Sequence, residues 1–408
     1  MRSAVKGSSH NFSPLATSAE WGGRVTRVEV NLDAIDANIR SLCKRAPGAE
    51  LMAVVKGDAY GHGAAAVAAT ALSGGARWLG VYTVQEGVGL RGASITAPIL
   101  VFGPFSAAEA AQIWDAQLTP TIHSIQAAGD LQRSAHGSKR LPFHLKIDTG
   151  LTRAGVEARD AVSFMRSLQQ FSALEAQGLY THFASADAPS KQLSQRQLQT
   201  FLEVSHALDQ AGFEFAVRHA ANSAAILDLP TSHLDLVRAG ISLYGYYPSA
   251  HVSRDVALRP ALSLVSAVTR VTRVPIGSGV GYDHEFRCSR ASTIALVPVG
   301  YGDGLARRLG NGRGTVLIRG MPAPICGRVS MDQVTVDVTD LPICQVGDEA
   351  VLIGRQAGAE QSADELGAQA DTISYEILTS LMPRIPRVYV RGGAVVGVSR
   401  LYHELETL

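Results

Sequence analysis

Cysteine is scarce in this sequence, and the common metal-binding motifs are missing. The four cysteines form no C-x-x-C pair, and the chain has neither an H-E-x-x-H motif nor a Cys/His cluster at ligand spacing. Because such clusters are the usual ligands of zinc, no metal site is expected. Residues 1–21 contain no apolar segment of the kind found in a secretory signal, so we expect reduced thiols and a cytoplasmic protein.

An excess of charge of one sign is absent as well. Lys and Arg number 37 against 36 Asp and Glu, so the chain lacks the positive surface that would bind nucleic acid or an anionic membrane. Hydrophobic residues make up 46% and charged residues 18%, which is the composition of a globular rather than a disordered protein. At 408 residues the chain exceeds the usual size of a single core, so we expect two domains and small-molecule chemistry.

Between about residues 25 and 258, apolar β-branched runs alternate with amphipathic stretches of helix length, which is typical of repeated βα units. Eight such runs end near Lys56, Val81, Phe102, Thr121, Asp148, Phe183, His219 and Arg238. Eight parallel strands of this kind predict an α/β fold, a (β/α)8 TIM-type barrel. A helix is expected after Asp33, and a longer one is expected to end at Gly212.

After Pro260 the pattern changes to short runs rich in Val, Ile and Thr, separated by turns that contain glycine. This pattern predicts a predominantly antiparallel β domain, with a helix near Ser374 to Met382. The predicted organisation is a polar, flexible extension over residues 1–21, a barrel over residues 22–258 and a β domain over residues 259–408.

A lysine follows the first apolar strand, LMAVV, directly. Reactive groups gather at the carboxyl ends of barrel strands, and Lys56 at such an end has the lowered pKa that a Schiff-base amine requires. A lysine whose stem crosses the barrel rim to reach water is the alternative. Gly57, Gly61 and Gly63 permit a tight turn here, while Tyr60 supplies an aromatic wall and a hydroxyl donor.

The turns after the last two predicted strands form the second candidate site. In this fold the loops at these places are a recurrent phosphate site, and backbone N–H groups near Gly240 and Ile241, with the Ser223 hydroxyl, are suited to that role. The neighbouring Asn222 is also expected to be a cofactor-binding residue. A phosphate site across the barrel mouth from a lysine implies a phosphorylated aldehyde cofactor, and pyridoxal 5'-phosphate (PLP) is the common one.

Seven segments in both domains resemble, in order, motifs of the alanine racemase family. AVVKGDAYGHG is similar to the PLP-lysine motif, with Gly57 where Ala or Asn is usual, and implies that Lys56 binds the cofactor. VRAGISLYG resembles V-R-x-G-I-x-x-Y-G and implies that Arg238 faces the pyridine nitrogen. A permanent positive charge there disfavours protonation of that nitrogen. The cofactor is then a weaker electron sink, which suppresses side reactions such as transamination.

A third motif, KIDTGLTR, resembles K-x-D-T-G-M-x-R with Leu151 in place of Met. It implies that Arg153 contacts the phenolic oxygen of the cofactor and the carboxylate of the substrate. The lysine that matches Lys146 is carbamylated in some relatives, and a carbamate there would be an anion able to pair with Arg153. A plain salt bridge from Lys146 to Asp148 or to another acid is the second interpretation, and both stay open.

The remaining motifs place residues around the cofactor and substrate. THFASAD implies that His182 lies beside the PLP ring, against the alternative of a structural histidine. GVGYD implies that Tyr282 is the second acid/base residue, because racemisation needs proton transfer on both faces of a planar intermediate. CGRVSMDQ and TISYE imply that the Met331 backbone meets the substrate carboxylate and that Tyr375 binds phosphate. In the family, Tyr282, Tyr301 and Met331 come from the partner subunit.

The resemblance implies a homodimeric PLP enzyme that interconverts L- and D-alanine and supplies D-alanine for peptidoglycan. Lys56 would serve the D enantiomer and Tyr282 the L enantiomer, while Tyr301 and Tyr375 narrow the entrance. A racemase for serine or for a broader amino-acid set is the nearest alternative. A decarboxylase of the same barrel family is disfavoured, because it has a carboxylate where this chain has Arg238. A non-catalytic PLP-binding protein is disfavoured by the β domain, which such proteins lack.

Overall fold

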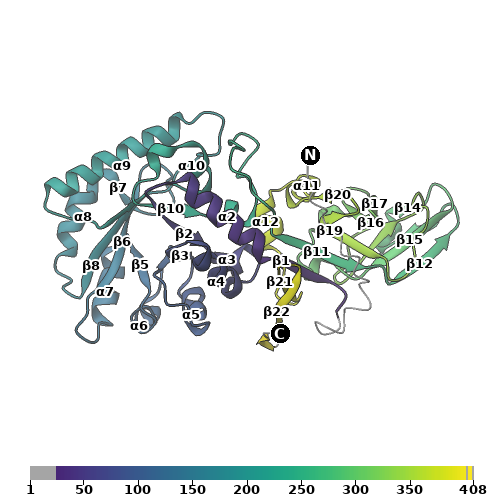
Figure 1. Cartoon of the computed structure of the whole chain (residues 1–408), viewed down its shortest axis with the longest axis horizontal. Coiled ribbons are helices and arrows are strands. Elements are labelled where there is room, and N and C mark those ends of the chain that lie inside the picture. Colours follow the sequence, from purple (N-terminus) through teal and green to yellow (C-terminus); the bar gives the residue numbers. More distant parts are fainter. Residues whose placement is uncertain (1–23, 401–402, 407–408) are drawn as a thin grey trace, which may run out of the picture. The chain divides into compact units, whose positions relative to one another are not determined.

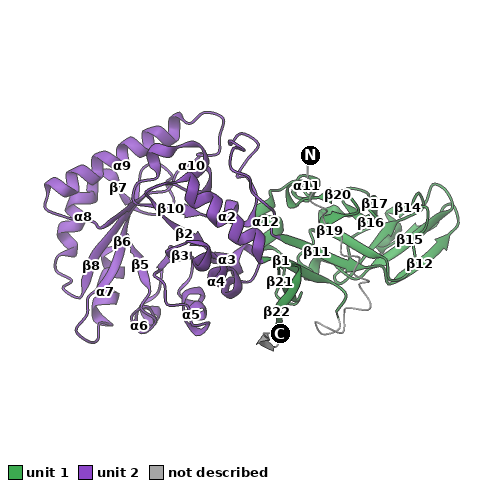
Figure 2. Ribbon diagram, viewed as in Figure 1, with its two compact units in different colours: residues 1–31, 262–408 green, residues 32–261 purple. Residues whose placement is uncertain are grey.

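The structure, a computed structural model, describes residues 24–400 and 403–406. The chain forms two compact units, residues 32–261 and residues 1–31 with 262–408 (Figure 2). The predicted flexible extension, residues 1–21, lies outside the described residues. In the described ranges, no helix combines the length and the apolar composition needed to cross a bilayer.

The first unit is built around eight parallel strands, and each is paired with the next in the order β10-β2-β3-β4-β5-β6-β8-β9. Their bounds are β2 (Glu50–Val54), β3 (Trp78–Val81), β4 (Ile99–Val101), β5 (Thr119–Ile122), β6 (Leu141–Asp148), β8 (Leu174–Tyr180), β9 (Val217–His219) and β10 (Leu236–Ala239), and a short β7 (Val156–Glu157) pairs with β6. Two backbone hydrogen bonds join the outer strands, from Asp235 to Arg218 (3.1 Å) and from Arg238 to Ala221 (3.0 Å). The barrel is therefore nearly closed, which confirms the predicted (β/α)8 fold.

Helices lie around the outside of these strands (Figure 1). They are α2 (Leu32–Arg45), α3 (Lys56–Tyr60), α4 (Ala64–Gly74), α5 (Val84–Gly92), α6 (Ala107–Asp115), α7 (Ile125–Arg133), α8 (Ala161–Leu168), α9 (Gln192–Gln210) and α10 (Ser223–Asp228). In α9 the residues Leu198, Phe201 and Leu208 are buried at helical spacing, and the helix ends before Gly212, whose φ is +84°. Both predicted helices of this unit are thus present.

The second unit is predominantly β, as predicted. Its main sheet has the order β12-β15-β18-β17-β16-β19-β11-β1-β21-β22-β23, with β20 paired to β19. The bounds are β1 (Arg27–Asn31), β11 (Leu262–Ala267), β12 (Arg270–Val274), β15 (Ser292–Val297), β16 (Thr315–Ile318), β17 (Met321–Cys326), β18 (Val334–Asp337), β19 (Glu349–Gln356), β20 (Ala359–Gln361), β21 (Arg387–Arg391), β22 (Ala394–Arg400) and β23 (His403–Glu406). A hairpin of β13 (Gly279–Val280) and β14 (Phe286–Arg287) and two helices, α11 (Ala363–Gln369) and α12 (Ser374–Thr379), complete it. Helix α12 lies where the sequence predicted one.

Strand β1 belongs to this second unit, although the sequence pattern placed the start of the barrel at residue 22. It pairs antiparallel with β11 and parallel with β21, which lie more than 200 residues further along the chain. The local sequence RVEVN predicts a strand but does not show which strands it pairs with. The boundary between the barrel and the β unit therefore could not be predicted from it.

Candidate active site

Lys56 lies just beyond the carboxyl end of β2, as the first residue of α3. The turn after it is strained, because Asp58, Ala59 and Tyr60 all have φ between +51° and +53°, a region that costs energy for residues with side chains. Glu86 holds the turn, since its Oε1 accepts a hydrogen bond from the Gly57 amide (2.6 Å). Such strain is concentrated at functional sites, where the surrounding structure imposes it.

Burial lowers the pKa of Lys56, and the positive charge of Arg153 lowers it further, while Glu86 acts in the opposite direction. Burial also lowers the pKa of Lys146, to about 8, and Arg153 and Arg238 add to this effect. The barrel mouth therefore collects two lysines and two arginines that repel one another. A site of this kind favours an anionic ligand and keeps part of its amine population unprotonated.

Asp148 shapes the loop that carries Arg153. Its Oδ1 accepts hydrogen bonds from the amides of Gly150 (2.8 Å), Leu151 (3.0 Å) and Thr152 (3.1 Å), and its Oδ2 accepts one from the Arg153 amide (3.1 Å). This carboxylate is thus committed to the backbone of its own loop. Among the described residues Lys146 has no ion pair, so the second interpretation, a salt bridge to Asp148 or to another acid, is not seen here.

Arg238 is buried in β10 and fixed from several sides. One of its η nitrogens donates to His219 Nδ1 (2.9 Å), and the other donates to the carbonyl oxygens of Thr181 and Ala220 (2.9 Å each) and lies 3.3 Å from His182 Nδ1. Because a guanidinium only donates hydrogen bonds, the acceptor nitrogen of His219 must be unprotonated. The guanidinium is therefore held rigidly beside two neutral histidines.

Behind Arg238, the histidine pair continues into the barrel core. His219 Nε2 lies 2.8 Å from His144 Nδ1, and the His219 ring stacks on Tyr180 at 4.7 Å with an angle of 7°. Sequence reasoning did not name His219, His144 or Tyr180 as part of the site. The signal for His219 was its place at the end of a predicted strand. His144 lies within β6 and Tyr180 ends β8, and both resemble ordinary core residues in the sequence.

The turns after β9 and β10, together with Tyr60, form a cradle lined by two hydroxyl groups. Ser223 Oγ accepts hydrogen bonds from the amides of Gly240 (2.9 Å) and Ser242 (3.3 Å). A Cβ at Gly240 would lie 3.0 Å from the Tyr60 hydroxyl and 3.6 Å from Ser223 Oγ, so a side chain there would fill the space between the two hydroxyls. Burial raises the pKa of Tyr60 to about 12, which keeps its hydroxyl available as a donor.

The other residues predicted for this cradle lie around it. Asn222 caps α10 by accepting a hydrogen bond from the Ala225 amide (3.1 Å), which fixes the turn before Ser223. Ile241 is the buried first residue of a short 3-10 helix, η3 (Ile241–Tyr244). An amine of lowered pKa, a hydroxyl-lined cradle and a fixed arginine fit the aldehyde, phosphate and pyridine groups of PLP respectively.

In the β unit, backbone hydrogen bonds join the two loops that carry the predicted substrate-binding residues Tyr301 and Met331. The amides of Tyr301 and Gly302 donate to the carbonyl oxygens of Ser330 (3.0 Å) and Met331 (2.8 Å). The side chains of Tyr301, Met331 and Tyr282 are 43%, 53% and 67% exposed, which is unusual for large apolar groups. A fourth predicted residue, Tyr375, lies in the first turn of α12.

The barrel and its lysine, cradle and arginine define a class of protein, the barrel-type PLP-binding proteins. Residues 30–248 match the family model described as "Alanine racemase, N-terminal domain", and residues 261–389 match "Alanine racemase, C-terminal domain". The chain is 44% identical over 364 residues to an alanine racemase of Carboxydothermus hydrogenoformans, covering 89% of this chain and 98% of that one. The chain belongs to the alanine racemase family, as the sequence motifs predicted.

Two solved structures show the same similarity in three dimensions. The alanine racemase of Bacillus anthracis with bound L-Ala-P has a TM-score of 0.88 and 38% identity, covering 92% of this chain and 98% of that chain. The alanine racemase of Bartonella henselae with covalently bound pyridoxal phosphate has a TM-score of 0.80 and 29% identity, covering 90% of this chain and 99% of that chain.

The buried histidines predict how the stability of the protein depends on pH. Burial lowers the pKa of His144 to about 3, and it lowers the pKa values of His182 and His219 well below the ordinary 6.5. Groups of this kind take up protons in the unfolded chain first, so the stability they contribute is present above pH 6.5 and is lost as the pH falls. We expect the free energy of unfolding to fall by up to about 1.4 kcal/mol per histidine for each pH unit below that value.

Thermal unfolding of the full chain, measured between neutral and acidic pH, checks this expectation. His144→Gln should flatten the pH dependence. In this pH range His144 takes up a proton only in the unfolded chain, and the substitution removes that proton uptake. His206→Gln, at an exposed position of α9, is the matched control and should leave the pH dependence unchanged. Equal slopes for wild type and His144→Gln would contradict the assignment.

Proposed function

We propose that this chain is a PLP-dependent alanine racemase that interconverts L- and D-alanine by a two-base mechanism. The observation that carries the proposal is the barrel mouth, where Lys56 in its strained turn lies in one site with the cradle at Ser223 and the fixed Arg238. The names of the relatives support alanine as the substrate, and the ligands in their solved structures support PLP as the cofactor.

In this mechanism PLP, when bound, withdraws electrons from the α-carbon of the amino acid and makes its α-proton acidic. The phosphate would be held by the Ser223 hydroxyl and by the backbone at Gly240 and Ile241, with Tyr60 and Tyr375 as hydroxyl donors. The buried Arg238 would discourage protonation of the pyridine nitrogen through its positive charge, and His182 would lie beside the ring.

The substrate is bound and deprotonated by groups on both sides. Arg153 pairs with its carboxylate, which the Met331 backbone also meets. Lys56 Nζ takes or returns the α-proton of D-alanine on one face, and Tyr282 Oη does so for L-alanine on the other. The lowered pKa of Lys56 increases the fraction of its amine that is available as a base.

For Lys146 we propose the carbamylated form. Its environment supports this, because a buried amine with a pKa of about 8 is partly neutral and because no ion pair holds it among the described residues. A neutral amine is the form that reacts with carbon dioxide, and the resulting anion would offset the charges of Arg153 and Arg238. We expect a carbamate signal in carbon NMR after incubation with labelled bicarbonate, and its absence from Lys146→Gln. An identical signal in the variant would assign the carbamate to another amine.

We propose a homodimer in which the β unit, residues 262–408 with β1, completes the active site in the partner's barrel, residues 32–261. The exposure of Tyr282, Tyr301 and Met331 supports this arrangement, because each is a large side chain left uncovered in the single chain. A cytoplasmic location and a role in supplying D-alanine for peptidoglycan complete the proposal. The four cysteines, all in described parts of the chain and all unpaired, are compatible with a reducing compartment.

The decisive experiment measures exchange of the α-proton with solvent deuterium across a panel of amino acids, using purified protein and added PLP. Alanine should exchange fastest and its two enantiomers should equilibrate. Faster exchange of serine would favour the alternative of a serine or broad-specificity racemase. Binding of PLP with no exchange for any amino acid would favour a non-catalytic PLP-binding protein.

A further inference from the structure

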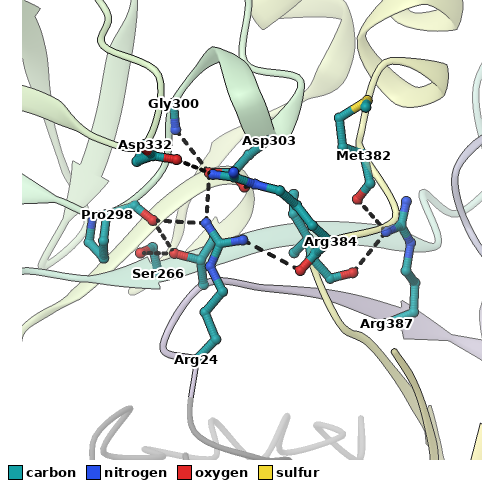
Figure 3. Close-up of polar contacts among 11 residues, drawn as sticks. Arg24, Ser266, Pro298, Gly300, Asp303, Asp332, Met382, Arg384 and Arg387 are labelled. Atoms are coloured by element: carbon teal, nitrogen blue, oxygen red, sulfur yellow. Dashed lines mark hydrogen bonds and ion pairs between the residues drawn. The ribbon is translucent and has the colours of Figure 1, made fainter. Parts of the chain in front are cut away.

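A fully buried carboxylate lies beneath two loops of the β unit. Asp303 has 0% exposure, and two arginines bind its two oxygens: Arg24 Nη2 at 2.7 Å and Arg384 Nε at 2.6 Å (Figure 3). Its Oδ2 also accepts a hydrogen bond from the Gly300 amide (3.1 Å), and its carbonyl accepts one from the Met382 amide (3.0 Å). The carboxylate of Asp303 therefore joins its own loop to two arginines, Arg24 and Arg384, that lie at opposite ends of the chain.

The ionic chain continues from Asp303 to the loop that carries Met331. The Arg384 Nη2 binds Asp332 Oδ1 at 2.5 Å, so a single guanidinium spans a buried and an exposed carboxylate (Figure 3). Asp332 directly follows Met331 in the chain, and Asp303 ends the short helix η5 (Tyr301–Asp303). We call Arg24, Asp303, Arg384 and Asp332 the Asp303 network.

Close backbone contacts hold the two loops against each other beside this network. A Cβ at Gly300 would lie 2.3 Å from the Ser330 carbonyl oxygen, and a Cβ at Gly302 would lie 3.0 Å from the Met331 carbonyl oxygen and 3.3 Å from the Arg384 guanidinium carbon. The loops meet backbone to backbone, through the two hydrogen bonds that link Tyr301 to Ser330 and Gly302 to Met331.

A buried carboxylate is costly unless it is paired. Burial acts to raise the pKa of Asp303, but hydrogen bonds from Arg24 and Arg384 outweigh it and leave the pKa below its usual value. The carboxylate thus stays charged and binds its arginines strongly. A geometry that depends on a planar guanidinium between two carboxylates tolerates little displacement of either loop.

We propose that Arg384 and Asp332 are positioning residues that hold Met331 and Tyr301 in register for the substrate carboxylate. The inference rests on the proposed function, in which Met331 and Tyr301 contact the substrate while the Asp303 network touches neither substrate nor cofactor. Loosening the network should therefore weaken substrate binding in the ground state and the transition state alike, which raises KM and leaves kcat nearly unchanged.

The test uses variants that keep the buried pair in place. Arg384→Lys keeps a positive charge beside Asp303 but cannot span both carboxylates, and Asp332→Ala removes only the exposed end of the network. Each should raise KM for alanine roughly tenfold with kcat within about twofold of wild type, at unchanged PLP content. The double variant should be no worse than either single one, because both remove the same link. Arg319→Ala, which breaks the similar Arg319–Asp348 pair of the same unit, is the control and should leave KM unchanged.

Amide hydrogen exchange gives a second readout that does not depend on activity. The amides of Tyr301 and Gly302 should exchange roughly tenfold faster in Arg384→Lys and Asp332→Ala than in wild type, and those of Arg319→Ala should match wild type. Unchanged exchange at these two amides, or faster exchange with an unchanged KM, would overturn the positioning role. A wild-type protein without alanine racemisation would instead overturn the proposed function, and exchange would still decide whether the network holds the loops.

Discussion

Lys56→Ala is expected to lose both the racemase activity and the covalent attachment of PLP. Lys56 is the amine at the end of β2, and the turn after it is held in a strained conformation by Glu86. Removal of the nucleophile and of one of the two bases should lower kcat by at least about a thousandfold. The visible absorbance of the bound cofactor should disappear in parallel, because no other amine replaces it. Activity assays and absorption spectra of the same preparations measure both effects.

Lys44→Ala is the matched control, since Lys44 is an exposed lysine in the last turn of α2. It should keep wild-type activity and absorbance. The closest competing amine is Lys146, which shares the barrel mouth with Lys56 and also has a lowered pKa. A Lys56→Ala protein whose cofactor can still be fixed by borohydride would show that another lysine, with Lys146 the first to examine, is the true anchor.

A heterodimer of one Lys56→Ala chain and one Tyr282→Phe chain is expected to be active, although each variant is inactive as a homodimer. In the proposed homodimer each site combines Lys56 of one chain with Tyr282 of the other, so a Lys56→Ala or Tyr282→Phe homodimer is impaired at both sites. A mixed dimer has one site with both substitutions and one site with neither. After unfolding and refolding of the mixture, the purified heterodimer should reach up to about half of wild-type activity.

A mixture of Lys56→Ala with Lys56→Arg is the control, because both variants damage the same residue and no subunit arrangement then yields an intact site. Its refolded dimers should stay inactive. If the heterodimer of Lys56→Ala and Tyr282→Phe is as inactive as its parents, the two residues belong to one chain's site. The exposure of Tyr282 in the single chain would then need a different explanation.

Much of the barrel could be predicted because its signals are local. Apolar runs of strand length alternate with helices, and all eight predicted strands are present, although the sixth ends at Tyr180 rather than near Phe183. The predicted residues Lys56, Ser223 and Arg238 lie at or just beyond strand ends, where this fold always gathers polar groups. The motif resemblance extended the prediction to the family, because motif residues keep their order and spacing along the chain.

Other parts of the fold and of the site could not be predicted, because they depend on contacts between segments that are distant in sequence. Local sequence patterns do not show which segments make such contacts. The sequence pattern places β1 in the barrel, whereas its pairing with β11 and β21 places it in the β unit. His144 and Asp303 looked like ordinary residues in sequence, yet one extends the contacts of Arg238 and the other joins two loops. A polar side chain inside a folded core has to find a partner, and that partner can lie anywhere in the chain.

The sequence by itself determined the order of the elements, the family and the identity of the residues at the strand ends, since hydrophobic period and motif spacing are properties of neighbouring residues. Only the tertiary structure decided the neutral state of His219 and the spanning of Asp303 and Asp332 by Arg384. Hydrogen bonds and ion pairs depend on distances of a few ångströms between atoms, and these distances exist only after the chain has folded.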